Sequence, residues 1–260
     1  MCLMLFAWKT HPGYPLVLAA NRDESYARPS TPLAFWPDAP RVLAGRDLEK
    51  GGTWLGITRD GRFAGITNYR QAHAYHDGAP SRGLLVGDFL LGEAPPAQYL
   101  NTLKAQGERY NGFNLIAGDT SGVYYYSNRL GEVHEVAPGI HGLSNHLLDT
   151  PWPKVEQGKQ ALARMMALSG EELIDELFAM LASRTLAMDD LLPDTGVGTA
   201  RERVLSPAFI AASGYGTRSS SVLLISKSGR VTFYEKSFAP MGETLGSVRH
   251  AFNIKQEPAR

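Results

Sequence analysis

Short apolar segments separated by turn-forming residues make up much of the chain. Residues 3–9 and 15–21 flank a His-Pro-Gly-Tyr sequence, whose turn residues predict an antiparallel hairpin. A second hairpin is expected where residues 53–58 and 63–68 flank an Asp-Gly pair, because this dipeptide supplies the positive φ angles of tight hairpins. Cys2 would then begin the first strand.

Helical periodicity is confined to two blocks. In the first, Ser81 could cap a helix through residue 90, and the prolines at 95 and 96 open another. The second block, residues 153–187, is broken at a Ser-Gly pair and predicts two helices. The other apolar segments predict an antiparallel meander and a final hairpin, and they span residues 113–117, 123–127, 133–136, 140–144, 220–226 and 230–238.

Antiparallel strand pairs with helices in two separate blocks predict an α+β fold rather than a doubly wound parallel sheet. The chain has 260 residues, of which 43% are hydrophobic, so one large core is possible and we expect a single domain over residues 1–260. Residues 194–216 are long enough to form a functional loop.

Charge and cysteine content narrow the function. Lys plus Arg and Asp plus Glu both total 26, so the net charge is near zero and nucleic acid is not an expected partner. A single cysteine cannot close an intrachain disulfide, which fits a reducing compartment. The apolar run at residues 3–8 is too short for a transmembrane segment and lacks the flanks of a targeting signal, so we expect a cytoplasmic protein.

The position of that cysteine suggests covalent chemistry. If Met1 is removed, Cys2 carries both a thiol and a free α-amine, with reference pKa values of about 8.5 and about 7.7 to 8.0. The amine can then accept the thiol proton, as in other N-terminal nucleophiles. The alternative is that Cys2 is a small apolar residue at the start of a core strand.

Four consecutive polar residues, Asn21 to Glu24, follow the apolar run at residues 16–20. Side chains alternate along a strand, so Asn21 and Asp23 should share one face, and Arg22 and Glu24 the other. Only one of these pairs can face the thiol. The alternative is a solvated strand end followed by a turn.

Two asparagines and an arginine occupy comparable positions at strand ends. Asn68 and Asn145 each end a predicted strand, where side-chain amides could form an oxyanion hole worth roughly 3 to 4 kcal/mol per donor. Arg218 precedes the last hairpin and could bind a carboxylate or hold the N-terminal strand. The alternatives are two turn residues and a surface arginine.

Metal and nucleotide sites are not expected. His73, His76 and Asp77 have only loose metal spacing in a polar loop. The Gly-x-Gly sequence at 214–216 precedes a strand, whereas a dinucleotide phosphate site needs the start of a helix.

Several motifs between residue 1 and about residue 225 resemble the NRDE family, also called the transport and Golgi organisation family. They are Met1-Cys2, Asn21-Arg22-Asp23-Glu24, Gly51-Gly52-Thr53-Trp54-Leu55-Gly56, Asn68-Tyr69-Arg70, Tyr110-Asn111-Gly112-Phe113-Asn114-Leu115, Leu143-Ser144-Asn145, Pro151-Trp152-Pro153-Lys154 and Gly216-Thr217-Arg218-Ser219-Ser220. This resemblance implies an N-terminal-nucleophile hydrolase-like fold, a four-layer αββα sandwich of two antiparallel sheets between helices.

The resemblance also implies a set of site residues. The penicillin V acylase and bile salt hydrolase group is similar in starting with Met-Cys and using that cysteine as the nucleophile. Its other site residues correspond here to Arg22, Asp23, Asn68, Asn145 and Arg218. Because Arg22 and Asp23 are adjacent, whereas the group separates them by two residues, Asn21 is a candidate substitute for Arg22.

Two functions follow as expectations. The first is hydrolysis or transfer of an acyl group at an amide or ester bond of a small molecule, for which no cofactor is required. The second is a non-enzymatic haem-binding or haem-trafficking carrier on the same scaffold, because members of the NRDE family are implicated in haem trafficking. Candidate axial ligands for haem are His134, His141, His146, Met165 and Met166.

Overall fold

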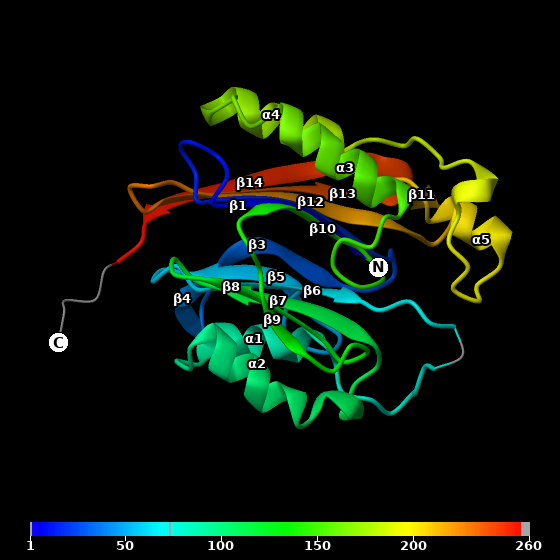
Figure 1. The fold of residues 1–260 in the computed structure, drawn as a ribbon, viewed down its shortest axis with the longest axis horizontal. Coiled ribbons are helices and arrows are strands. Elements are labelled where there is room, and N and C mark those ends of the chain that lie inside the picture. Colours follow the sequence, from blue (N-terminus) through cyan, green and yellow to red (C-terminus); the bar gives the residue numbers. More distant parts are fainter. Residues whose placement is uncertain (1, 73, 256–260) are drawn as a thin grey trace.

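The computed structural model describes residues 2–72 and 74–255 and contains four layers. Two antiparallel sheets lie face to face, with α3 (Pro153–Arg164) and α4 (Gly170–Leu181) over one and α1 (Gly83–Leu91) and α2 (Pro96–Lys104) over the other (Figure 1). A shorter helix, α5 (Thr199–Val204), lies at one end of the molecule. This is the αββα sandwich that the resemblance to the NRDE family implies.

Each sheet has seven strands. The first has the order β10 (Gly139–Leu143), β1 (Cys2–Trp8), β2 (Leu16–Ser25), β12 (Tyr215–Ile225), β13 (Arg230–Phe238) and β14 (Thr244–Asn253), with β11 (Ala211–Ala212) paired to β12. The second is a meander of β3 (Ser30–Trp36), β4 (Ala39–Asp47), β5 (Leu55–Thr58), β6 (Phe63–Asn68), β7 (Phe113–Gly118), β8 (Val123–Ser127) and β9 (Val133–Glu135). Short 3₁₀ turns are η1 (Gly107–Arg109), η2 (Asp189–Leu191) and η3 (Pro240–Gly242).

Apolar residues cover both faces of the central strands, which explains why these strands are almost continuously hydrophobic. Along β1, Met4 and Phe6 point into the core between the sheets, and Leu3 and Leu5 point to the core under α3 and α4. This alternation fixes the register of the first hairpin, because a slip of one residue would exchange the two cores.

The predicted hairpins and the helices of both blocks are confirmed. The meander is confirmed only for β7, β8 and β9, because β10, its predicted fourth strand, pairs with β1 in the first sheet. Four strands and one helix were missed: β3, β4, β11, β14 and α5. Both β3 and β14 are edge strands with exposed side chains, so their hydrophobic pattern is weak. The expected long loop contains α5 and β11, and the final hairpin begins earlier than predicted, at Tyr215. The helix α1 begins at Gly83 without a side-chain cap, so the predicted cap at Ser81 is wrong.

Strand pairing brings distant sequence segments together at one end of the first sheet. Cys2 pairs with Arg22 on the neighbouring strand, and Arg22 in turn pairs with Ser219 on β12. The register of β12 shifts between Thr217 and Ser219, which leaves Arg218 as the extra residue of a β-bulge. Bulges redirect a side chain relative to the regular alternation. Among the residues that the structure describes, no helix is long and apolar enough to cross a membrane.

Candidate active site

A polar pocket of about 150 Å³ lies where β1 begins, and we call it the Cys2 pocket. The first sheet contributes Cys2, Arg22 and Asp23 to its lining, and the second sheet contributes Asn68. The segment 79–82 before α1 and the first residue of α1 also line it. Four of the seven predicted site residues therefore converge on one pocket.

Cys2 is only partly exposed, at the first position of β1. Burial raises the pKa of its thiol, and the negative charge of Asp23 raises it further. The positive charge of Arg22 and a hydrogen bond from the backbone N–H of Asp23 act in the opposite direction. The thiol is therefore not a ready thiolate, and a nearby base must take its proton before it can attack.

The alternation along β2 decides which polar side chain faces the thiol. Arg22 does: its guanidinium lies 4.3 Å from the ring centre of Trp54 and donates to the Ser30 hydroxyl at 3.3 Å. Burial lowers the pKa of Arg22.

Asn21 points to the opposite face, toward the helical layer. Its amide donates to the carbonyls of Leu181 and Ala208 at 2.9 and 2.8 Å and accepts from the Ser220 hydroxyl. The structure thus brings Arg22, and not Asn21, to the Cys2 pocket.

Asp23 also lines the pocket and is almost fully buried. Its carboxylate accepts a hydrogen bond from the Thr217 hydroxyl at 2.7 Å, and its carbonyl accepts one from Tyr215. Burial raises the pKa of Asp23, and the ammonium of Lys154 opposes this increase.

Lys154 is a functional candidate that the residue-by-residue reasoning missed, although it lies in the Pro-Trp-Pro-Lys motif. It is buried in the first turn of α3 and donates to the Leu205 carbonyl at 2.9 Å. Burial lowers its pKa to about 8, and the charge of Asp23 raises it. The ammonium therefore supplies a buried positive charge near Asp23, although Lys154 itself does not line the pocket.

The two asparagines have different positions. Asn68 lines the pocket at the end of β6, whereas Asn145 is fully buried and does not line it. The Asn145 amide donates to the Asn68 carbonyl at 2.9 Å, and the Asn145 carbonyl accepts from the backbone N–H of Arg70 at 2.7 Å. Asn145 therefore holds the backbone that presents Asn68.

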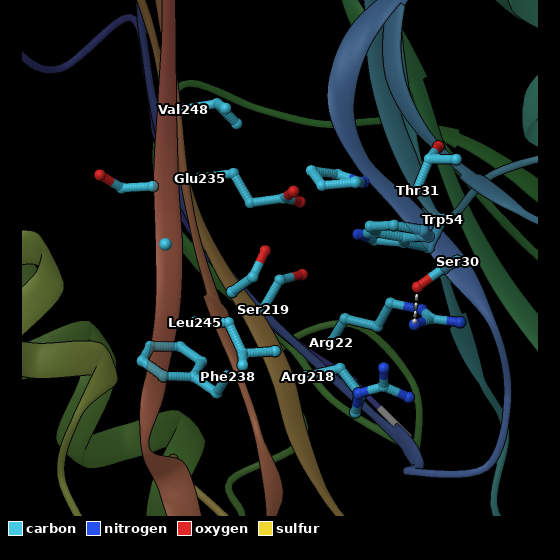
Figure 2. A pocket seen from close by; sticks show the side chains of 14 residues that line it. Arg22, Ser30, Thr31, Trp54, Arg218, Ser219, Glu235, Phe238, Leu245 and Val248 are labelled. Atoms are coloured by element: carbon cyan, nitrogen blue, oxygen red, sulfur yellow. Dashed lines mark hydrogen bonds between the residues drawn. The ribbon is translucent and has the colours of Figure 1, made fainter.

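Arg218 holds the chain that follows β2. Its Nη1 donates to the carbonyls of Ser25, Tyr26 and Arg28 at 2.9, 3.2 and 3.0 Å. It lines a second cavity, which lies between the two sheets and which Figure 2 shows from close by. We call this the interlayer cavity; Arg22 and Trp54 line both cavities.

Two further residues of the Cys2 pocket were missed. Arg82 donates to the Gly112 carbonyl at 2.9 Å, and burial lowers its pKa. Asn111 exchanges hydrogen bonds of 2.8 and 2.9 Å with the backbone of His76, which fixes the loop over the pocket. Asn111 lies in the Tyr-Asn-Gly-Phe-Asn-Leu motif that resembles the NRDE family, whereas Arg82 had no sequence signal beyond its position next to Ser81.

The candidate haem ligands His134, His141, His146, Met165 and Met166 are not among the residues that line this pocket. His73 and Met1 are outside the described residues, and within those residues no group of three or more His, Cys, Asp and Glu could hold a metal ion. Both ring nitrogens of His141 have partners, Asp149 and the Ala137 carbonyl, and those of His146 have Tyr69 and Thr150. Haem binding stays a prediction.

Similar proteins extend this picture. The family model "Transport and Golgi organisation 2" matches residues 1–240. Two Transport and Golgi organization protein 2 homologues, from Bos taurus and Homo sapiens, are 40% and 39% identical to this chain. The matches cover 98% and 91% of this chain, and 100% and 93% of the two homologues. The Drosophila melanogaster protein is 30% identical over 94% of this chain and 95% of its own.

Two solved structures share the fold at low identity. The C2A mutant of conjugated bile acid hydrolase from Clostridium perfringens has a TM-score of 0.52 at 9% identity, over 99% of this chain and 94% of its own. An N-acylethanolamine-hydrolyzing acid amidase orthologue from Caenorhabditis elegans has a TM-score of 0.51 at 10% identity. The match covers 86% of this chain and 92% of the orthologue. These likenesses identify the N-terminal-nucleophile hydrolase fold. The sequence matches establish that the chain belongs to the Transport and Golgi organisation 2 family.

Proposed function

We propose that this protein cleaves or transfers an acyl group at an amide or ester bond of a small molecule, with Cys2 as the nucleophile. One observation carries the proposal: the only cysteine of the chain lines a pocket with Arg22, Asp23 and Asn68 at the start of β1. Two hydrolases share the fold, and one of them was solved with its cysteine at position 2 replaced. Inert buried cysteines do not usually lie in such a polar setting.

In the proposed reaction, the α-amine of Cys2 takes the thiol proton once Met1 is removed. The sulfur then bonds to the substrate carbonyl carbon, and the carbonyl electron pair moves to oxygen. Asn68 donates to this oxyanion. When the intermediate collapses, the bond to the leaving nitrogen or oxygen breaks and the leaving group takes the proton from the ammonium. Water, or another acceptor, then cleaves the thioester and restores the thiol.

The surrounding residues have positioning roles. Asp23, held by Thr217, lies near the nucleophile, where its negative charge favours the ammonium form of the amine. Lys154 limits the rise in the pKa of Asp23 and so favours its charged form. Asn145 keeps Asn68 in place through its backbone carbonyl.

The test is intact-mass spectrometry of the protein before and after exposure to an electrophilic acyl probe. Because the chain has one cysteine, any thiol adduct must lie on Cys2. We expect loss of the Met1 mass, one adduct per chain, and no adduct on Cys2→Ala. Turnover of a panel of N-acyl and ester substrates then identifies the bond that is cleaved.

Two outcomes count against this function. Retention of Met1 in protein that still turns over substrate would exclude the amine as the base, since an acylated nitrogen cannot accept the proton. If the probe leaves Cys2 unmodified and no substrate turns over, whereas haem titration gives a saturable Soret change that survives Cys2→Ala, the carrier function replaces the enzymatic one.

A further inference from the structure

The interlayer cavity has a lining unlike that of the Cys2 pocket. It has a volume of about 280 Å³ and opens between the edge strands β3 and β14. Figure 2 shows Phe238, Leu245 and Val248 on the side of β13 and β14, with Trp54 facing them from the second sheet. The cavity thus offers an apolar body rather than a ring of charges.

Two arginines line one end of this cavity, Arg22 and Arg218 (Figure 2). Burial lowers the pKa of Arg22, and the positive charge of Arg218 lowers it further. Within the described part of the chain neither arginine forms an ion pair. Like charges placed together beside a cavity, without a carboxylate, are unfavourable unless an anion joins them.

The acidic residues nearby are already occupied. Arg28 pairs with Asp47 at 2.7 Å and with Glu24 at 3.6 Å, so these two carboxylates are shared with another cation. Arg22 instead contacts a hydroxyl and an aromatic face, and the three hydrogen bonds of Arg218 described above run from Nη1 to backbone carbonyls. Guanidinium groups placed this way can still bind a carboxylate in a forked geometry.

A buried acid, Glu235, lines the same cavity. It accepts from the backbone N–H of Leu33 on β3 at 2.8 Å and from Ser221 on β12 at 3.5 Å, and its pairing partner on β14 is Val248. Burial raises its pKa to about 7, and Arg22 is the charged group that opposes this. Below neutral pH, Glu235 is therefore mainly uncharged and does not neutralise the arginines.

We propose that the interlayer cavity binds an amphipathic carboxylate, with the carboxylate between Arg22 and Arg218 and the apolar chain against Phe238, Leu245 and Val248. A cavity of 150 Å³ holds benzene, so this one has room for roughly ten non-hydrogen atoms. A medium-length fatty acid has that size. Binding itself does not depend on the chemistry of Cys2; if the proposed hydrolysis also holds, the released acid belongs to this class.

The test is calorimetric titration with sodium octanoate at pH 6, with octanamide as the uncharged analogue of the same shape. We expect one octanoate site per chain and at least about tenfold weaker binding of octanamide, because charged hydrogen bonds are the stronger ones. Arg218→Met should weaken octanoate by a similar factor. Arg230→Met, at the far end of β13, should leave binding unchanged.

Because Arg218 also anchors the loop after β2, its replacement could disturb folding, and a second pair of variants avoids this. Leu245 is exposed at the rim of the cavity, so substitutions there leave the core intact. Leu245→Glu should weaken octanoate binding, and Leu245→Lys should preserve or strengthen it. Equal affinities for octanoate and octanamide, or no difference between these two variants, would overturn the proposal. Acyl labelling of Cys2 is scored separately, so failure of one proposal does not imply failure of the other.

Discussion

The Cys2 pocket and the interlayer cavity share a wall, yet they are built from different parts of the fold. Strand ends and the segment before α1 form the polar Cys2 pocket. The interlayer cavity lies between the faces of the two sheets and is lined mainly by strand interiors. Arg22 and Trp54 belong to both. Polar side chains therefore gather at the strand ends, and apolar side chains line the space between the sheets.

The largest expected effect is on the Cys2 pocket. Asn68→Ala removes the candidate oxyanion donor from the Cys2 pocket and should lower the rate of acyl transfer by about 10² to 10³-fold. The octanoate affinity of the interlayer cavity should not change, because Asn68 does not line it. Single-turnover acylation of Cys2, measured by intact mass against time, gives the rate.

The matched control is the asparagine on the opposite face of the site. Asn21→Ala leaves two carbonyls and a buried hydroxyl without their partner, which should destabilise the fold by roughly 1 to 3 kcal/mol. The acylation rate of the folded fraction should remain near that of wild type. If Asn21→Ala slows acylation as much as Asn68→Ala does, the separation of the two faces of β2 is wrong.

The sequence predicted features that depend on one strand, but not those that depend on contacts between distant segments. Alternation along β2 correctly separates Asn21 from Arg22, which lies beside Cys2. It did not limit the pocket to one pair, because Asp23 lines the pocket as well. The hydrogen bond from Asn145 to the Asn68 carbonyl connects the segment after β10 in one sheet to the end of β6 in the other. Periodicity along one strand carries no information on how the two sheets stack. The bulge that redirects Arg218 likewise depends on pairing between β2 and β12.

Glu235 shows that some signals were present but not recognised. It continues the inward-facing series of Val231 and Phe233 along β13, so strict alternation places a carboxyl group in the core. Lys154 occupies the first turn of a helix, where a charged residue usually reaches solvent, and only the packing of the segment near Leu205 buries it. Such burial is a property of the tertiary structure.

The next prediction concerns the cost of the buried acid in the interlayer cavity. The pKa of Glu235 is about 7 in the folded protein against 4.5 for the ordinary group, so the folded state holds its proton more tightly. This contribution is present in full below pH 4.5 and is lost as the pH rises through 7. Relative to Glu235→Gln, wild type should therefore lose about 3 kcal/mol of unfolding free energy between pH 4.5 and pH 8.

Urea denaturation of both proteins at several pH values measures this difference. Glu243→Gln, at an exposed position before β14, is the control and should follow the wild-type profile. A constant gap between wild type and Glu235→Gln across this pH range would show that the carboxyl is not buried in the way described. The interlayer cavity would then be open to water, and it would no longer contrast with the polar Cys2 pocket.

The smallest expected effect falls on the shared wall. The Trp54 ring stacks on the Arg22 guanidinium, a contact worth roughly 0.5 to 2 kcal/mol, and Trp54→Phe keeps an aromatic ring but reduces its area. Acylation of Cys2 and octanoate binding should therefore both weaken, each by about threefold. Gly45→Ala offers a second approach, because an added Cβ would collide with the Trp54 ring and displace it. Since both cavities depend on the same stacked pair, the two variants should shift both readouts in the same direction. A change in only one readout would mean that Arg22 serves the two cavities independently.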